Sequence, residues 1–138
     1  MTLELNGAPV PLRLEKGFAH LTRTWQAGDP GTLRLPLGVR RVASYEAVAE
    51  NRGRVALERG PLVYCAEAVD NGGAVSDPHL PDDAPLTARH DPALLGGVTL
   101  IEGAGLTLVP YYAWSHRGEG EMGVWLEQQS VQAQARNF

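Results

Sequence analysis

The chain has 138 residues and a formal net charge of −4, and 43% of its residues are hydrophobic. This is enough sequence for one domain with a substantial core, and the mildly acidic balance lacks the basic surface that nucleic acids and anionic membranes require. No apolar run approaches the roughly 20 residues that cross a bilayer, and the single cysteine, Cys65, excludes an internal disulfide and a multi-cysteine zinc site.

The N-terminal part of the chain is predicted to form short antiparallel strands. Asn6-Gly7 lies between two alternating apolar segments, and this dipeptide is a strong hairpin signal because both positions tolerate positive φ. Further strands are expected over 18–25 and 32–37, where side chains alternate between two faces. The core-facing residues of the second of these strands are expected to be Leu33, Leu35 and Leu37.

The stretch 51–67 combines the most apolar strand sequence of the chain with several charges. Arg59-Gly60-Pro61 predicts a bend or bulge, since Gly60 takes backbone angles that other residues avoid and Pro61 fixes its own φ. Arg54, Glu58 and Arg59 are expected to form a satisfied structural polar cluster at this bend, because buried charge must be paired. Glu67 is also expected to be buried and ion-paired, next to Arg54 and Arg59. The core residues of the stretch are expected to be Val55, Leu57, Leu62 and Tyr64.

The second half of the chain begins with a long irregular loop, predicted over about 70–96 from its Asp, Gly and Pro content. Strands are expected over 98–102, 106–109 and 122–127, and 128–138 is expected to be a flexible tail. Short strands separated by turn signals predict an all-β fold over 1–127, an antiparallel β-sandwich or jelly roll.

Candidate catalytic and metal-ligating groups are few. The histidines do not share a metal-ligand spacing on one element, so neither a metal nor another cofactor is expected. Cys65 lies in an apolar strand, where a cysteine usually acts as a small buried residue. The carboxylate pairs Asp82-Asp83 and Glu119/Glu121 lie in loops and are interpreted as exposed acidic residues, although paired carboxylates also carry sugar chemistry.

An aromatic cluster follows the strand at 106–109. Tyr111, Tyr112 and Trp114 are candidates for a sugar-stacking surface, with a place in the core or at a domain interface as the competing interpretation. Trp125, between Val124 and Leu126, is expected in the core. The residues alone leave both interpretations of the aromatic cluster open.

Several segments carry a family resemblance when they are taken together. The most specific is Asn51–Cys65, which ends in Arg-Gly-Pro-Leu-Val-Tyr-Cys. The others are Leu5-Asn6-Gly7 with Pro9-Val10, Gly17-Phe18 followed by 23–29, Asp70-Asn71, and Pro110–Trp114 through Arg117, Met122, Val124 and Trp125. These segments extend to about Leu126, and they resemble the C-terminal region of the β-L-arabinofuranosidase family, glycoside hydrolase family 127.

The resemblance implies that catalysis belongs elsewhere. In this family a helical (α/α)6 barrel carries a cysteine nucleophile, a zinc-cysteine-glutamate cluster and a glutamate acid/base, and β-sandwich domains surround the barrel. The family's paired-cysteine motif is absent here, and Cys65 lies in the sandwich motif, so no catalytic residue carries over. The chain alone is therefore expected to be a non-catalytic accessory domain that supports the barrel domain, with a homodimer as a further expectation and a stand-alone carbohydrate-binding module as the alternative.

Two expectations concern the beginning of the chain. The resemblance starts late in the family's sandwich, so the first strand or strands of that sandwich are expected to be missing. The N-terminal residues have neither the basic start nor the apolar stretch of a signal peptide, and a cytoplasmic location is expected.

Overall fold

The computed structural model describes residues 1–128 and divides the chain into two compact units, Met1–Leu37 and Gly38–Phe138. The boundary between them falls inside the range 1–127 that was predicted as one domain. All but the first residue of the predicted tail 128–138 lies outside the described residues. Among residues 1–128, no helix is long and apolar enough to span a bilayer.

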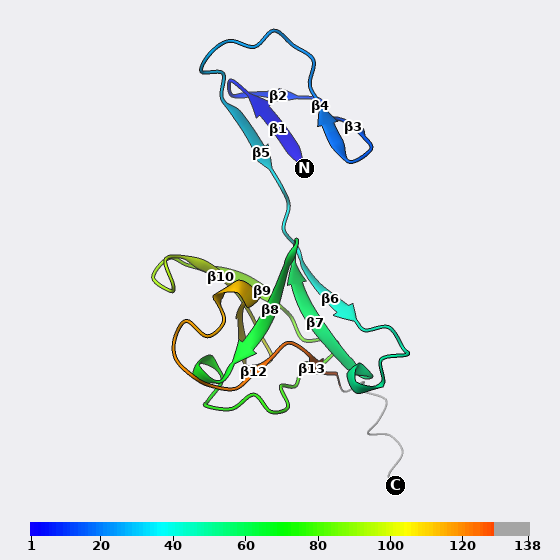
Figure 1. The fold of residues 1–138 in the computed structure, drawn as a ribbon, viewed down its shortest axis with the longest axis vertical. Coiled ribbons are helices and arrows are strands. Elements are labelled where there is room, and N and C mark those ends of the chain that lie inside the picture. Colours follow the sequence, from blue (N-terminus) through cyan, green and yellow to red (C-terminus); the bar gives the residue numbers. More distant parts are fainter. Residues whose placement is uncertain (129–138) are drawn as a thin grey trace. The chain divides into compact units, whose positions relative to one another are not determined.

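The first unit is built from short antiparallel strands (Figure 1). Its three-stranded sheet has the order β2-β1-β5, and a separate hairpin pairs β3 with β4. The predicted Asn-Gly turn is confirmed: Leu5 pairs with Ala8, and Asn6 and Gly7 have φ values of 51° and 75°. The strands are β1 (Thr2–Leu5), β2 (Ala8–Val10), β3 (Arg13–Glu15), β4 (Phe18–His20) and β5 (Gly31–Arg34).

Few side chains are buried in this unit. Within residues 1–37, Leu3 and Leu5 are buried, whereas Leu33 is 51% exposed and Leu35 is 56% exposed. The prediction that Leu33 and Leu35 face a core is therefore wrong for these two positions. Alternation identified a shared apolar face, but a single three-stranded sheet has no second layer within residues 1–37 to cover it.

The second unit contains one curled antiparallel sheet of eight strands within the described residues (Figure 1). Its order is β13-β7-β8-β11-β10-β9, with β6 added beside β7 and β12 beside β8. This arrangement confirms the predicted all-β, sandwich-like fold. The strands are β6 (Val39–Ala43), β7 (Arg54–Arg59), β8 (Leu62–Glu67), β9 (Thr87–Asp91), β10 (Val98–Gly103), β11 (Leu106–Pro110), β12 (Met122–Gly123) and β13 (Leu126–Glu127), and the short 3-10 helices are η1 (Ala49–Asn51), η2 (Ala68–Asp70) and η3 (Tyr111–Ala113).

Strand β8 lies between the two hydrophobic clusters of this unit. Tyr64 and Ala66 belong to the larger cluster, while Cys65 belongs to the smaller one, as alternation along a strand requires. This burial on both faces explains the continuous apolar sequence of β8. The predicted core residues of β7 and β8 are confirmed, since Val55, Leu57 and Tyr64 lie in the larger cluster and Leu62 packs against it.

Two details of the predicted strand pattern are corrected. Arg59 pairs with Leu62, so Gly60-Pro61 forms the two-residue turn of the β7–β8 hairpin rather than a bulge within one strand. Gly60 adopts a φ of 57°, which an L residue takes only with strain. The predicted loop 70–96 also contains β9, an edge strand of five residues whose side chains are mostly exposed.

Candidate functional site

The residues of the predicted polar cluster all lie on β7, but they do not pair with one another. Arg54 Nη2 donates to Glu127 Oε1 at 3.1 Å, and Arg40 Nη2 donates to Glu58 Oε2 at 2.7 Å. Both pairs join residues that are directly opposite on neighbouring strands. Arg59 faces the other side of β7, and its Nε is buried without a hydrogen-bond partner in the described part of the chain. The predicted cluster is corrected to two cross-strand ion pairs.

Glu67 is the most enclosed carboxylate of the second unit. It ends β8, is 5% exposed and accepts a hydrogen bond from Arg117 Nη2 at 2.6 Å. Arg117 Nη1 also donates to Asp70 Oδ1 at 2.6 Å, and these hydrogen bonds to the Asp70 and Glu67 carboxylates raise the pKa of Arg117 above its ordinary value. The backbone N–H of Ser115 donates to Glu67 at 2.9 Å. The expected burial and ion pairing of Glu67 are confirmed, but its partner is Arg117 and not the expected Arg54 or Arg59.

Asn71 adds a second connection at the same end of β8. Its Nδ2 donates to the carbonyl oxygens of Glu67 and Thr107 at 2.8 and 2.9 Å, and its Oδ1 accepts from the Thr107 N–H at 2.9 Å. The Asp70-Asn71 pair therefore joins η2 to β11 and, through Arg117, to the loop that follows η3. This gives a structural reason for a motif that the sequence resemblance had identified.

The aromatic cluster predicted from the sequence lies at the surface, on η3 and the residue that follows it. We call Tyr111, Tyr112 and Trp114 the aromatic ledge; they are 47%, 61% and 39% exposed. The rings of Tyr111 and Trp114 have centroids 6.0 Å apart and are tilted by 34°. Ala113, between them, is buried in the smaller cluster and holds η3 against the sheet. The structure thus places the three predicted residues together, at the surface.

A hollow of about 320 Å³ adjoins the ledge. It is lined by Leu95, Val98, Tyr112, Ala113 and His116. The lining is largely apolar. The ledge and the hollow together therefore form one apolar surface. Such a surface suits a protein contact or the apolar face of a sugar ring.

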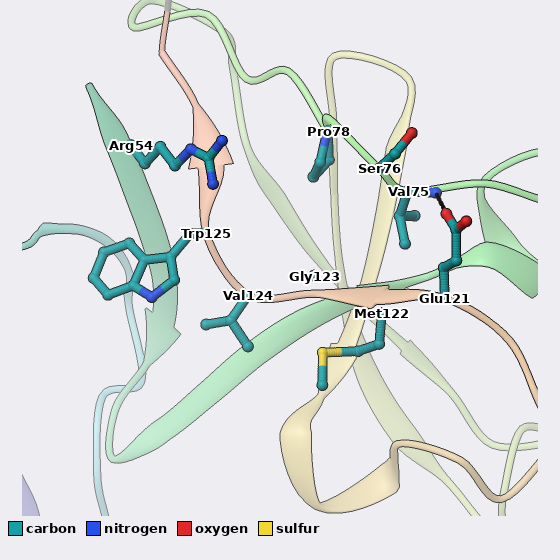
Figure 2. Close-up of a pocket in the computed structure, with 9 residues that line it drawn as sticks. All are labelled: Arg54, Val75, Ser76, Pro78, Glu121, Met122, Gly123, Val124 and Trp125. Carbon is teal, nitrogen blue, oxygen red and sulfur yellow. Dashed lines mark hydrogen bonds between the residues drawn. The ribbon is translucent and has the colours of Figure 1, made fainter. Parts of the chain in front are cut away.

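A groove of about 380 Å³ lies elsewhere on the same unit, between the segments 75–78 and 121–125 (Figure 2). Arg54 and Trp125 lie at one end of the groove, and Ser76 and Glu121 lie at the other. Val75, Pro78, Met122, Gly123 and Val124 complete the lining. Apart from Arg54, the lining comes from two short segments that are far apart in the sequence, and no local motif marks them as one site.

The two walls of the groove are joined at both ends. At one end the Glu121 carboxylate accepts a hydrogen bond from the Val75 N–H at 3.0 Å. At the other, the Glu127 N–H donates to the Pro78 carbonyl at 2.8 Å, and the Leu80 N–H donates to the Glu127 carbonyl at 2.9 Å. The predicted strand 122–127 is interrupted between these ends, since β12 ends at Gly123 and β13 begins at Leu126. Trp125 lies in the interruption and is partly exposed, although it was expected in the core.

Cys65 does not have the properties of a catalytic nucleophile. Its side chain is fully buried, and this desolvation, followed by the charge of Glu67, raises the pKa of the thiol to about 12. Within residues 1–128 no three His, Cys, Asp or Glu side chains are close enough together to hold a metal ion. The zinc-cysteine-glutamate cluster that the resemblance assigns to the catalytic barrel therefore does not fit the residues described here.

Comparison with known proteins adds a family to this geometry. A model of the glycoside hydrolase family 127 C-terminal domain matches residues 39–127, and this match begins one residue after the start of the second unit. The non-reducing end β-L-arabinofuranosidase of Bifidobacterium longum subsp. longum is 37% identical over 90% of this chain and 23% of its own length. A family 127 β-L-arabinofuranosidase from Geobacillus stearothermophilus T6 matches with a TM-score of 0.78 and 38% identity over 93% of this chain and 24% of its own.

A third solved structure, a family 127 β-arabinofuranosidase, gives a TM-score of 0.81 and 36% identity over 93% of this chain and 23% of its own. The chain thus spans about a quarter of the length of the relatives it matches. The resemblance found in the sequence is confirmed, and the family model covers well over half of the chain. The chain therefore belongs to glycoside hydrolase family 127, of which it represents the C-terminal domain.

Proposed function

We propose that the chain is a non-catalytic C-terminal β domain of a β-L-arabinofuranosidase-like hydrolase and that it supports the helical catalytic barrel. The observation that carries this proposal is the match of 39–127 to the family's C-terminal domain, together with relatives about four times as long as the matched part. The state of Cys65 supports it, because a buried thiol with a pKa of about 12 is almost entirely protonated at neutral pH.

The aromatic ledge is the surface that we assign to the contact with the barrel. Its three exposed aromatic side chains lie on η3 and on the residue that follows it, and the next residues of the chain are fixed to Glu67 by hydrogen bonds from Ser115 and Arg117. Large aromatic side chains on a rigid support are typical of the buried centres of protein interfaces. A domain with such a surface would bury it against the barrel and keep the barrel from exposing apolar surface of its own.

An exchange of domains with the Bifidobacterium enzyme tests this role. The C-terminal segment of that enzyme would be deleted in one version and replaced by this chain in another, and the soluble yield, thermal unfolding and arabinofuranosidase activity of both would be measured. We expect the deleted version to be aggregated or strongly destabilised, since apolar surface would be exposed. Replacement by this chain should restore a soluble, active enzyme.

Variants of the exchanged domain separate the ledge from the rest of the surface. Trp114→Ser with Tyr112→Ser should reduce the restored stability. Tyr45→Ser is the control: Tyr45 is 79% exposed but lies outside the ledge, so its replacement should leave the restored stability unchanged. If the deleted enzyme is as stable and active as the intact one, the supporting role is refuted. If the ledge variants restore as well as the unchanged chain, the barrel contact lies elsewhere.

The homodimer stays a prediction of the family resemblance. Sedimentation velocity of the exchanged enzyme over a range of concentrations measures it directly. A dimer that persists on dilution supports the prediction, and a monomer at all concentrations contradicts it.

The ledge also supports a second candidate function, a carbohydrate-binding surface formed by Trp114, Tyr111 and Tyr112. The exposed Tyr111–Trp114 pair favours it, because sugar rings stack their C–H faces on aromatic rings. This function predicts that a saccharide perturbs the Trp114 indole and that Trp114→Ala abolishes binding.

A further inference from the structure

We propose that the groove between segments 75–78 and 121–125 is a binding site for a neutral saccharide. It is separate from the aromatic ledge, and it involves Trp125, Arg54, Ser76 and Glu121. The proposal relies on the proposed function only for its first choice of probe, an arabinofuranoside. The groove itself is defined by the geometry of the second unit (Figure 2).

The size and rigidity of the groove suit a small ligand. Its volume of about 380 Å³ lies within the range of known ligand sites, about 300–1,000 Å³. The hydrogen bond from Val75 to Glu121 closes one end, and those between Pro78, Leu80 and Glu127 close the other. Because both walls are already fixed, a ligand that binds there does not have to order them.

Gly123 lines the groove between its two walls and adds no side chain to it. A Cβ atom at Gly123 would lie 3.5 Å from Pro78 Cγ and 3.6 Å from the Val75 carbonyl oxygen, which is ordinary van der Waals contact. A larger side chain at this position would therefore occupy the space between the walls. Met122 and Val124, on either side, line the groove and also pack against the smaller hydrophobic cluster.

The polar groups at the two ends are complementary to hydroxyl groups. Arg54 can only donate hydrogen bonds, the Glu121 carboxylate can only accept them, and the Ser76 hydroxyl does both. A sugar hydroxyl also does both, so one molecule with several hydroxyls can serve both ends. The indole of Trp125, partly exposed beside Arg54, offers an apolar face for the C–H groups of the ring.

The charges of the groove favour a neutral ligand over an ionic one. Arg54 is already paired with Glu127 at 3.1 Å, and Glu121 lies at the opposite end. An anion would meet the Glu121 carboxylate, and the guanidinium that could attract it is already paired with Glu127, whereas a cation would meet the guanidinium. An uncharged polyol avoids both penalties and still satisfies the hydrogen-bonding groups.

The three tryptophans of the chain give a direct test. Trp25, Trp114 and Trp125 each contribute one indole N–H signal to the ¹⁵N spectrum of the full chain, and Trp→Phe variants assign the signals. Methyl β-L-arabinofuranoside, an arabino-oligosaccharide and a xylo-oligosaccharide would be added separately to about 20 mM, well above a Kd of about 1 mM. We expect a saturable shift of the Trp125 signal with at least one of them and no shift of the Trp25 signal.

Two variants show whether the polar ends bind the sugar. Ser76→Ala and Glu121→Gln should each raise Kd by about threefold to tenfold, as expected for one lost or weakened hydrogen bond. The amide oxygen introduced by Glu121→Gln can still accept the hydrogen bond from the Val75 N–H, so the groove should stay formed. Glu119→Gln, on the neighbouring exposed segment, is the matched control and should leave Kd unchanged.

The outcomes separate this proposal from the others. A Trp125 signal that stays fixed with all three saccharides overturns it, as does a Kd that neither variant changes. A shift confined to Trp114 also overturns it and assigns binding to the ledge. These results are independent of the domain-exchange experiment, so the groove can fail while the supporting role stands, and the reverse.

Discussion

Glu67 and Arg117 show how one buried carboxylate fixes a loop 50 residues further along the chain. A carboxylate removed from water is unstable unless hydrogen bonds and an opposite charge replace its hydration. Burial of Glu67 was predictable, since it ends the most apolar strand of the sequence. Its partner was not, because Arg117 lies in a polar, glycine-containing segment and only the path of the chain brings the two together.

Removal of Arg117 should strongly destabilise the second unit. In Arg117→Met, Glu67 stays buried without a cation, and we expect a loss of about 3–5 kcal/mol in the free energy of unfolding. Urea unfolding followed by circular dichroism measures it. Arg89→Met is the control: Arg89 pairs with Glu102 at 2.8 Å, but the two side chains are 50% and 33% exposed, and the loss should be below about 1 kcal/mol. Equal losses for the two variants would show that Glu67 is not enclosed as described.

Cys65 should make stability depend on pH above 9. Burial raises the pKa of its thiol from 9.0 to about 12, so the folded chain keeps a proton that the unfolded chain releases in this range. The contribution of the buried thiol to the free energy of unfolding is therefore complete below pH 9.0 and declines as the pH rises towards about 12. Urea midpoints on either side of pH 9.0, compared between the unchanged chain and Cys65→Ala, measure this effect. The decline should be steeper in the unchanged chain, and identical slopes would contradict a buried thiol.

At the scale of elements, local chemistry predicted the hairpin at Asn6-Gly7 and both strands of the β7–β8 pair. Gly60-Pro61 was recognised as a break in direction, but the choice between a bulge and a turn depended on the pairing of Arg59 with Leu62. Strand β9 was missed because its sequence, Thr-Ala-Arg-His-Asp, lacks an apolar face. It forms through pairing with β10, which the sequence of β9 alone does not indicate.

The end of β10 offers a test of how closely the loop before β9 approaches the sheet. A Cβ atom at Gly103 would lie 2.5 Å from the Pro85 carbonyl oxygen and 2.7 Å from Leu86 Cδ2. Gly103→Ala must therefore push this loop away, and we expect a cost of about 1–3 kcal/mol, seen as a lower midpoint of thermal unfolding. Gly38→Ala is the matched control, because no heavy atom lies within 4 Å of its added Cβ. A Gly103→Ala variant as stable as this control would contradict the close approach.

At the scale of the whole molecule, both hydrophobic clusters lie entirely within the second unit. The first unit contributes Leu3 and Leu5 as its buried side chains. Sequence patterns predicted the all-β class for both units, because alternation sets the face of each strand. They did not predict where a second layer covers that face, which is a property of the assembled sheets.

A fragment that contains residues 38–138 should therefore fold without the first unit. It keeps every member of both clusters and the Glu67–Arg117 pair, and we expect a single cooperative unfolding transition. Differential scanning calorimetry measures this transition. A fragment with no cooperative transition would show that the first unit is required for the core of the second.

We propose that this chain, the C-terminal domain of a glycoside hydrolase, is non-catalytic. The most direct measurement is the hydrolysis of a β-L-arabinofuranoside by the purified chain, with and without added zinc, beside Cys65→Ala at the same concentration. We expect no release above the uncatalysed rate from either protein under either condition, because the buried Cys65 thiol stays protonated at neutral pH. Saturable turnover that is proportional to chain concentration and absent in Cys65→Ala would contradict it.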